Sequence, residues 1–485
     1  MSMEAGLPAE TPTAPRLART APAPKTGIVH LGLGAFFRAH GAIYTEEAMQ
    51  ASGGDWGIAG VSLQSGSTRD ALAPQGGSYI ALELAPEGVR PRHVQVISQV
   101  LVAPENPHAV LDLLADPAVK IVSLTVTEKG YCHEPSSGAL NLAHPDIAHD
   151  IANPLPRSAP GFLLRGLQAR RAAGLAPFTA LSLDNLPHNG AVLRGVVLAL
   201  AREIDPALAA WIAAEGRFPA SMVDRIVPAT KLEDIARVEA LTGFHDAAPV
   251  AHEPFRQWVI EESFVGGERP DWGAVGAQMV ADVTPYEHMK LRMLNGTHSA
   301  LAYLGYLAGH ATIAATIADP VFARYAQRLW QEEIIPALSP PPGENLQAYA
   351  QALAHRYANP AIAHRTWQIA MDGSQKLPQR ILATLAESLA AGRPTPGLML
   401  AVAGWMRYVG GVDEQGAAIE VNDPLAARLR ALSDGAPSPA AKVAALLSLR
   451  EVFPADLAVA LQAPVAAAYA RLMALGARGA VMEVA

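Results

Sequence analysis

The chain has 485 residues, of which 50% are hydrophobic and 17% charged, and its formal net charge is -8. This length and composition predict a globular protein of about two domains with ample core volume. The modest acidity and the lack of a Lys/Arg run disfavour nucleic acid and anionic membranes as partners. The single cysteine, Cys132, excludes a disulfide framework and a cysteine-based metal site, and it fits a reducing cytosol.

The first 26 residues are rich in Ala, Pro and Thr and contain no apolar segment of the kind found in signal peptides. We therefore expect a disordered leader over residues 1–26. The best apolar run, residues 192–201, is shorter than the roughly 18 residues that a membrane span needs, and it fits a buried helix. These features predict a cytoplasmic protein with no membrane partner.

A β-rich run over residues 27–31 leads directly into the glycine-rich turn Gly32-Leu-Gly34, which precedes a predicted helix over residues 42–49. A strand, a glycine-rich turn and a helix open a dinucleotide-binding βαβ unit. The two glycines let the backbone turn tightly and approach a pyrophosphate, which the helix N-terminus favours. Residues 27–283 are accordingly predicted to form a dinucleotide-binding domain.

The glycine motif is incomplete, because Phe37 stands where the usual pattern has a third glycine. The turn alone is therefore a weak signal, and by itself it favours a plain structural role. Arg38 strengthens the cofactor interpretation, since a cation beside the turn could neutralise phosphate. Ile28 and Phe36 are counted with these residues as candidates for cofactor binding.

The second predicted strand, residues 56–62, is followed by no carboxylate that could bind the ribose of NAD. No arginine lies directly at its end either, although Arg69 follows a few residues later. The sequence therefore leaves both NAD and NADP open.

Two later strands, residues 121–127 and 178–183, are apolar runs of the kind buried on both faces of a parallel sheet. Ligands of open α/β sheets bind beyond the carboxyl ends of the strands. Polar residues at these ends are therefore candidates for cofactor binding or catalysis, with a surface turn or an Asx turn as the alternative. These candidates are Thr125, Glu128, Lys129 and Asn185.

A helix start is predicted at residue 284, where Thr284 suits the N-cap, Pro285 the first helical position and Glu287 a capping box. Residues 284–485 show helical periodicity and little strand signal. We therefore expect a domain boundary near residue 283 and a helical C-terminal domain over residues 284–485.

Beyond this start, Lys290, Asn295 and His298 share one broad arc with Glu287 when the segment is drawn at about 100° per residue. Polar groups on an otherwise apolar face need partners or take part in chemistry. A solvated helix face is the alternative interpretation. With one cysteine and no paired His/Asp spacing, we expect no metal site.

Several motifs together resemble those of the mannitol dehydrogenase family, the polyol-specific long-chain dehydrogenases. The resemblance extends from about residue 27 to beyond residue 450. The motifs are Gly32-x-Gly34-x-Phe36-x-Arg38-Ala39-His40, Thr127-Glu-Lys-Gly130-Tyr131, Asp184-Asn185-x-Pro-x-Asn189-Gly190, Glu253-Pro-Phe-x-Gln257-Trp258 and Lys290-Leu-x-x-Leu-Asn295-x-x-His298.

This resemblance implies an α/β protein with a Rossmann-type N-terminal domain, a mostly α-helical C-terminal domain, NAD as cofactor and no metal. It implies that Lys290 is the general acid/base and that Asn185 and Asn295 donate amide N–H groups to the developing alkoxide. His298 would hold substrate hydroxyls or orient Lys290. Glu287 would gate proton exchange with water, with the capping box as its alternative role.

Within the family, residues 121–132, 366–380, 403–409 and 446–453 are most similar to the branch that interconverts D-mannonate and D-fructuronate. A substrate carboxylate calls for Arg or Lys, and the candidates are Lys376, Arg380 and Arg225, with Asp224 as a hydroxyl acceptor.

Two alternative functions remain open: a polyol 2-dehydrogenase acting on mannitol, arabinitol or sorbitol, and a nucleotide-sensing protein without catalysis. We expect a small-molecule sugar acid or polyol as the partner and a monomer or small homo-oligomer.

Overall fold

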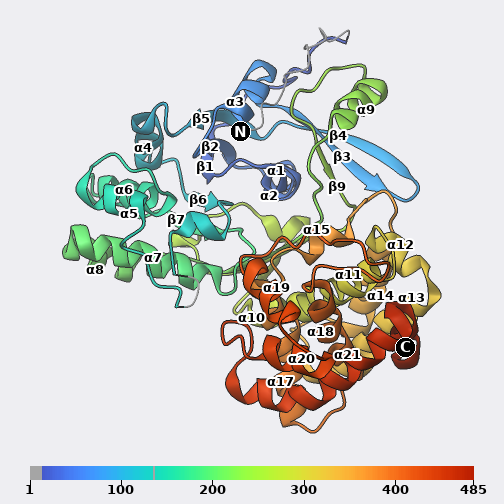
Figure 1. Ribbon diagram of the computed structural model, residues 1–485. Coiled ribbons are helices and arrows are strands. Elements are labelled where there is room, and N and C mark those ends of the chain that lie inside the picture. The colour runs from blue at the N-terminus through green and yellow to red at the C-terminus, as the bar shows by residue number, and fades with distance from the viewer. Residues whose placement is uncertain (1–13, 135–136) are drawn as a thin grey trace. The chain divides into compact units, whose positions relative to one another are not determined.

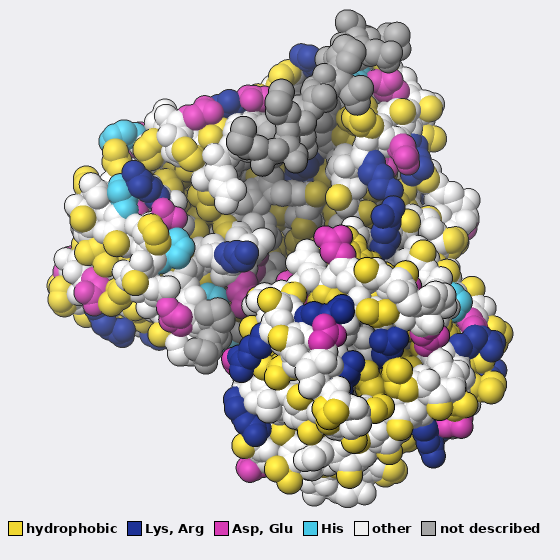
Figure 2. Space-filling view, in the orientation of Figure 1, with side chains coloured by type: hydrophobic (Ala, Val, Ile, Leu, Met, Phe, Trp, Pro, Cys, Tyr) yellow, Lys and Arg dark blue, Asp and Glu magenta, His cyan; other side chains and the backbone are white. Residues whose placement is uncertain are grey.

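The computed structural model describes residues 14–134 and 137–485. The chain divides into two compact units, Met1–Val283 and Thr284–Ala485, which we call unit 1 and unit 2. Figure 1 shows that unit 1 combines strands with helices, whereas unit 2 is built mainly from helices. On the visible face of each unit, apolar, basic and acidic side chains are interspersed (Figure 2).

The centre of unit 1 is a five-stranded parallel sheet. Counted along the chain, its strands lie in the order 3-2-1-4-5, which is the order of a Rossmann-type doubly wound sheet. The predicted α/β fold class is therefore confirmed. In spatial order the strands are β5 (Ile97–Val102), β2 (Gly57–Ser62), β1 (Thr26–Leu31), β6 (Ile121–Leu124) and β7 (Thr179–Ser182).

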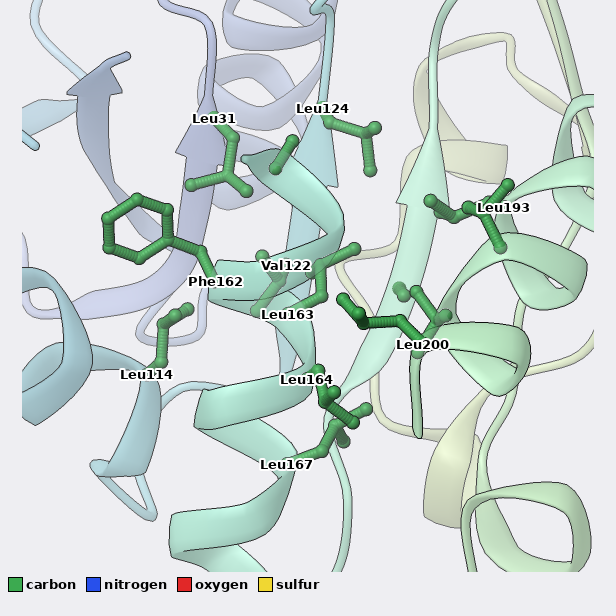
Figure 3. Packing of buried hydrophobic residues seen from close by; sticks show 14 of the residues in the cluster. Leu31, Leu114, Val122, Leu124, Phe162, Leu163, Leu164, Leu167, Leu193 and Leu200 are labelled. Carbon is green, nitrogen blue, oxygen red and sulfur yellow. The ribbon is translucent and has the colours of Figure 1, made fainter. Parts of the chain in front are cut away.

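Helices cover both faces of this sheet, because successive side chains of each strand point to opposite faces. Figure 3 shows Leu31, Val122 and Leu124 of the strands packed with Phe162 and Leu163 of α6. The other face packs against α1 and α2. The helices of unit 1 are α1 (Ala35–Ala39), α2 (Gly41–Ser52), α3 (Ser67–Leu72), α4 (Pro107–Ala115), α5 (Pro145–Ala152), α6 (Ala159–Ala172), α7 (Asn189–Ile204), α8 (Pro206–Glu215) and α9 (Leu232–Thr242).

Two small sheets complete unit 1. In the first, β3 (Tyr79–Ala85) pairs with β4 (Gly88–Val94) in antiparallel and with β9 (Val250–His252) in parallel orientation. In the second, β10 (Gln257–Glu261) lies between β8 (Ser221–Asp224) and β11 (Gln278–Val280).

The predicted disordered leader is wrong for its second half. Leu17 is buried, and its backbone N–H donates to the carbonyl of His245 at 2.8 Å. Arg19 Nε donates to the carbonyl of Gly76 at 2.8 Å. This segment is ordered because its apolar side chain and its guanidinium both find partners in unit 1. The first half of the prediction, residues 1–13, lies outside the described residues.

Unit 2 is organised around α18 and α11, which contact each other and α21. Almost every residue of α18 is buried, as expected of a helix surrounded by other helices. The helices are α10 (Thr284–Met289), α11 (Thr297–Leu307), α12 (Ile313–Ala318), α13 (Pro320–Arg328), α14 (Leu346–Tyr357), α15 (Thr366–Ala370), α16 (Gly373–Leu377), α17 (Ala383–Ala390), α18 (Pro396–Tyr408), α19 (Ala426–Asp434), α20 (Pro439–Leu447) and α21 (Ala455–Val484).

Three segments of unit 2 are π-helical: Lys290–Gly296, Leu329–Ile334 and Pro378–Leu382. The first joins α10 to α11 and contacts the other two. The prediction that residues 284–298 form one continuous α-helix is therefore wrong over Lys290–Gly296. π-Helical turns are rare and are frequently found at functional sites.

The last helix, α21, corrects the expectation that no segment is apolar and long enough to span a membrane. By length and composition alone, this helix of 30 residues could cross a membrane. One such helix is weak evidence of a membrane span. Here α21 packs against α18 and α20, contains Pro464, and has a non-helical residue at Gly476.

Candidate active site

The glycine-rich turn lies at the carboxyl end of β1. Gly32 has φ +88°, and a Cβ on it would lie 2.2 Å from the carbonyl oxygen of Thr125, so only glycine fits there. Thr125 Oγ1 donates to the Gly32 carbonyl at 2.8 Å, which ties the turn to the end of β6. A Cβ on Gly34 would meet no atom closer than 3.8 Å among the described residues. The second glycine therefore leaves open space at the place where a pyrophosphate approaches in dinucleotide-binding folds.

His30 supports this turn from inside unit 1, and sequence reasoning missed it. Its ring nitrogens lie 2.9 Å from Ser123 Oγ and 2.9 Å from Thr125 Oγ1. Its ring stacks on Phe37, with the ring centroids 3.3 Å apart. Burial lowers the pKa of His30 to about 3, so the imidazole is neutral at physiological pH. The only sequence signal was a polar residue inside an otherwise apolar strand.

The side chains of three predicted cofactor-binding residues face the interior of unit 1 instead. Ile28 and Phe37 belong to the hydrophobic core. The guanidinium of Arg38 is buried, lies over the Tyr79 ring at 5.3 Å and donates through Nη1 to the Ala248 carbonyl at 2.5 Å. The prediction that Arg38 neutralises a phosphate is therefore corrected, because its charge is directed into the core. Phe36 is partly buried and stacks on His40.

The turn after β6 has a strained backbone. Thr127 has φ +62°, which is unusual for a β-branched residue. The buried carboxylate of Asp184 holds this turn, because it accepts hydrogen bonds from the backbone N–H groups of Val126 at 3.0 Å and Thr127 at 2.9 Å. Glu128 and Lys129, both predicted cofactor contacts, follow this turn and are exposed.

Asn185 lies just beyond the end of β7, after Leu183 and Asp184, and is exposed. The position of the β7 end depends on Asn189, which was not predicted as a site residue. Asn189 Nδ2 donates to the carbonyls of Asp184 at 3.0 Å and Ser221 at 2.7 Å, and its Oδ1 accepts from the Ser221 N–H at 3.0 Å. The amide thereby joins the ends of two segments that lie far apart in the sequence.

Two further predictions concern cations of unit 1. Arg69 pairs with the carboxylates of Asp70, at 2.7 Å, and Glu105. Arg225 Nη1 donates to the Ala39 carbonyl at 2.6 Å, and its Nε donates to the Glu253 carbonyl at 3.1 Å. Burial, followed by the nearby charge of Arg256, lowers the pKa of Arg225 to about 10. Arg225 therefore has a structural role in unit 1, which corrects its prediction as a carboxylate ligand. Its neighbour Asp224 is buried in β8.

In unit 2, the π-helical segment Lys290–Gly296 begins with Lys290 and contains Asn295, and His298 follows in the first turn of α11. All three side chains are buried, and Glu287 is buried in α10. Asn295 Nδ2 is buried and has no hydrogen-bond partner among the described residues. A buried amide donor without a partner is costly, and it suits a group that a ligand will satisfy.

Two contacts hold this π-helical segment in place. Arg292 makes a bidentate ion pair with Glu387 of α17, with N–O distances of 2.5 and 2.7 Å. A Cβ on Gly296 would lie 2.5 Å from the Arg380 carbonyl oxygen, so the backbone of Pro378–Leu382 packs directly against it. Neither contact was predicted from the sequence, because both join residues that are distant along the chain.

His298 lies among basic and aromatic side chains. Its ring centroid is 5.1 Å from that of Tyr357 and 4.7 Å from that of His364. Burial lowers the pKa of His298 well below its usual value, and the neighbouring His364, Arg380, Arg356 and Lys376 lower it further. His298 is therefore neutral at physiological pH.

We call Arg356, Lys376 and Arg380 the basic cluster. Arg380 is half-buried, and its Nη1 donates to Ser299 Oγ, next to His298, at 3.0 Å. Lys376 Nζ donates to the Met371 carbonyl at 2.6 Å and lies 3.7 Å from the Asp372 carboxylate. Burial, and next Arg380, lowers the pKa of Lys376. The predicted carboxylate ligands Lys376 and Arg380 thus lie together near His298, and sequence reasoning missed Arg356 and His364.

Among the described residues, no group of three or more His, Cys, Asp or Glu side chains is arranged to hold a metal ion. The groups that the structure does assemble are hydrogen-bond donors, a neutral imidazole and cations. This arrangement can bind an anionic, hydroxyl-rich molecule and stabilise negative charge on an oxygen atom.

Two family models match the chain in succession. The Mannitol dehydrogenase Rossmann domain matches residues 26–274, and the Mannitol dehydrogenase C-terminal domain matches residues 282–473. The predicted family resemblance is therefore confirmed. D-mannonate oxidoreductase of Escherichia coli (strain K12) is 48% identical over 461 residues, which cover 93% of this chain and 94% of that protein.

Mannitol 2-dehydrogenases are also similar. The protein of that name from Phaeosphaeria nodorum is 43% identical over 414 residues, covering 84% of this chain and 73% of that protein. A solved structure of Pseudomonas fluorescens mannitol 2-dehydrogenase, a ternary complex with NAD and D-mannitol, matches with a TM-score of 0.84 and 39% identity. That match covers 98% of this chain and 97% of the other.

Proposed function

Because the chain belongs to the mannitol dehydrogenase family of oxidoreductases, we propose that it interconverts D-mannonate and D-fructuronate with NAD as cofactor. The observation that carries this proposal is the basic cluster beside His298 in unit 2. A hexuronate has a carboxylate that a sugar alcohol lacks. Partly or fully buried cations beside a hydroxyl-binding site are what such a carboxylate requires.

NAD fits the turn at the end of β1. The open space beside Gly34 and the tight turn at Gly32 suit the approach of a pyrophosphate. Arg69 is already paired with Asp70 and Glu105, which disfavours a role in binding the 2′-phosphate of NADP. When bound, NAD would accept a hydride from the alcohol carbon or, as NADH, return it to the ketone.

Lys290 moves the proton in this proposal. Interconversion of a secondary alcohol and a ketone requires one proton transfer at the substrate oxygen, and a side chain has to carry it. Lys290 is buried at the start of the π-helical segment, and burial disfavours the charged form of an amine. It would accept the hydroxyl proton during oxidation and return it during reduction.

Asn295 would stabilise the charge that develops on the same oxygen. Its Nδ2 group is buried and has no partner among the described residues, so a substrate oxygen can accept its hydrogen bond without displacing another acceptor. His298, neutral because of its burial, would bind a neighbouring substrate hydroxyl. The role of Asn185 as a second amide donor and that of Glu287 in proton exchange stay predictions.

Lys376 and Arg380 would bind the substrate carboxylate. A charge-assisted hydrogen bond contributes about 1.5–3 kcal/mol, which corresponds to roughly 10–100-fold in kcat/KM. We therefore expect the wild-type protein to prefer D-fructuronate over D-fructose by at least this factor. The oxidation of NADH is followed by absorbance with each of the two ketoses, which measures the substrate preference. The same assay repeated with NADPH measures the cofactor preference.

The matched variants are Lys376→Met and Arg428→Met. Lys376→Met should remove most of the preference for D-fructuronate. Arg428→Met should not, because Arg428 pairs with Glu451 on the surface of unit 2. Turnover of D-fructose without turnover of D-fructuronate would overturn the proposal. It would favour the second candidate, a polyol 2-dehydrogenase, which the similarity to mannitol 2-dehydrogenases over nearly the whole chain supports.

A further inference from the structure

The position of the Lys376 amine depends on an irregular turn that precedes α16. Lys376 Nζ donates to the Met371 carbonyl, and the Lys376 backbone N–H donates to the Asp372 carbonyl at 3.0 Å. Asp372 has φ +54°, a left-handed conformation that is uncommon outside glycine. Such a conformation persists only where the surrounding structure holds it. Arg380 follows in the π-helical continuation of the same helix.

The residue that holds this turn is Asp423, which lies in the segment before α19. Its Oδ2 accepts from the Ser374 N–H at 2.7 Å, and its Oδ1 accepts from Ser374 Oγ at 2.6 Å. The adjacent carbonyl of Asn422 accepts from the Asp372 N–H at 2.9 Å. These three hydrogen bonds fix the strained turn from one side.

The other side of the turn is fixed by packing. A Cβ on Gly373 would lie 2.5 Å from Trp405 Nε1 and 2.6 Å from Tyr303 OH, so the backbone packs directly against α18 and α11. Both polar atoms are buried and lack a hydrogen-bond partner among the described residues. His298 lies in α11 as well. The packing against Tyr303 therefore fixes the position of the turn relative to the helix that carries His298.

We propose that Asp423 is a positioning residue that orients Lys376 and Arg380 toward the carboxylate of the substrate. The inference rests on the proposed function, because it presupposes a carboxylate-bearing substrate. Asp423 acts through Ser374 and the turn at Asp372, and it touches neither the substrate nor the reacting atoms. Loss of its carboxylate lets the start of α16 shift, so the basic side chains no longer meet the carboxylate in one geometry.

The test compares Asp423→Asn and Ser374→Ala with the wild-type protein in the direction of ketone reduction. Asp423→Asn replaces one acceptor oxygen by an amide donor, and Ser374→Ala removes only the hydroxyl hydrogen bond. We expect KM for D-fructuronate to rise about tenfold or more in Asp423→Asn and by a smaller factor in Ser374→Ala. We expect kcat to stay within about threefold, and the affinity for NADH, measured by fluorescence titration, to be unchanged.

The matched control is Asp413→Asn. The carboxylate of Asp413 also accepts two backbone hydrogen bonds in a turn of unit 2, from Gln415 and Ala417, but it makes no contact with the turn before α16. Its KM for D-fructuronate should equal that of the wild type. If Asp423→Asn fails to fold, judged by circular dichroism, Ser374→Ala decides the test.

The outcomes separate the two proposals. A wild-type protein that reduces D-fructuronate, with an unchanged KM in folded Asp423→Asn and Ser374→Ala, overturns the role of Asp423 alone. That role is also overturned if Asp423→Asn changes kcat and KM for D-fructuronate by the same factors as it changes them for D-fructose. Such a result indicates general damage to the protein. A wild-type protein that does not reduce D-fructuronate overturns the proposed function, and the inference with it.

Discussion

Glu333 offers a test of the energetics of unit 2. It is buried in the π-helical segment Leu329–Ile334, and its two carboxylate oxygens accept hydrogen bonds at 2.8 Å from the N–H groups of Gly397 and Leu398 at the start of α18. Burial raises the pKa of Glu333 from 4.5 to about 7, although these hydrogen bonds oppose the rise. The folded protein therefore binds this proton more tightly than the unfolded chain does.

The sign of the pH effect follows from this difference. The stabilisation is fully present below the unfolded pKa of 4.5 and is lost as the pH rises through about 7. At about 1.4 kcal/mol for each pKa unit, the wild type should lose about 3 kcal/mol of unfolding free energy over this range relative to Glu333→Gln. The glutamine has no proton to lose, so the difference between the two proteins isolates this group from the other titrating residues.

Urea unfolding at a series of pH values, followed by tryptophan fluorescence, measures this difference. Glu332→Gln is the matched control, since Glu332 is the neighbouring residue but is exposed and pairs with Arg328 at 3.0 Å. Its stability curve should run parallel to that of the wild type from about pH 5 to about pH 8. Parallel curves for wild type and Glu333→Gln would refute the reasoning, because they would mean that Glu333 titrates alike in the folded and unfolded states.

Three further predictions concern the site. Lys290→Ala should lower kcat by on the order of 10²–10⁴, and retention of activity within about tenfold in the NADH absorbance assay would rule out its role as acid/base. Asn295→Ala should slow the hydride step by on the order of 10²-fold in single-turnover kinetics, whereas an unchanged rate constant would contradict the oxyanion role. Gly32→Ala should lower the melting temperature, because its Cβ would clash with the Thr125 carbonyl, whereas Gly34→Ala should leave melting unchanged and weaken NADH binding in a fluorescence titration. Equal melting temperatures for Gly32→Ala and the wild type would contradict the steric argument.

Some of this structure could be predicted because its signals are local. The β-rich run before Gly32 and the apolar runs that form β6 and β7 are short buried strands, which composition and periodicity identify. The helical character of unit 2 follows from periodicity over many residues, so single errors matter little. Lys376 and Arg380 could be found because a carboxylate ligand requires cations, and the sequence has few cations in the stretches that carry the family resemblance.

Other features could not be predicted because they depend on contacts between distant residues. Arg38 lies next to the glycine turn in the sequence, yet its guanidinium is directed to Ala248, 210 residues away. Arg225 likewise bonds to Ala39, at a separation of 186 residues. The sequence shows that these residues are cations but not which carbonyls will surround them. Asp184 stands out in the sequence only as a neighbour of Asn185, although its carboxylate holds the strained turn at Thr127.

The π-helical segment resolves a difficulty in the helical-wheel argument. In an α-helix, Asn295 lies about 140° around the axis from Lys290, so the two side chains lie at opposite edges of the arc that they share. A π-helix pairs each residue with the one five positions away, so its turn is wider and residues separated by five positions lie closer to the same side than in an α-helix. Lys290 and Asn295 are separated by five positions within Lys290–Gly296. The wider turn therefore brings the acid/base candidate and the amide donor closer to the same side than an α-helix with the same sequence would.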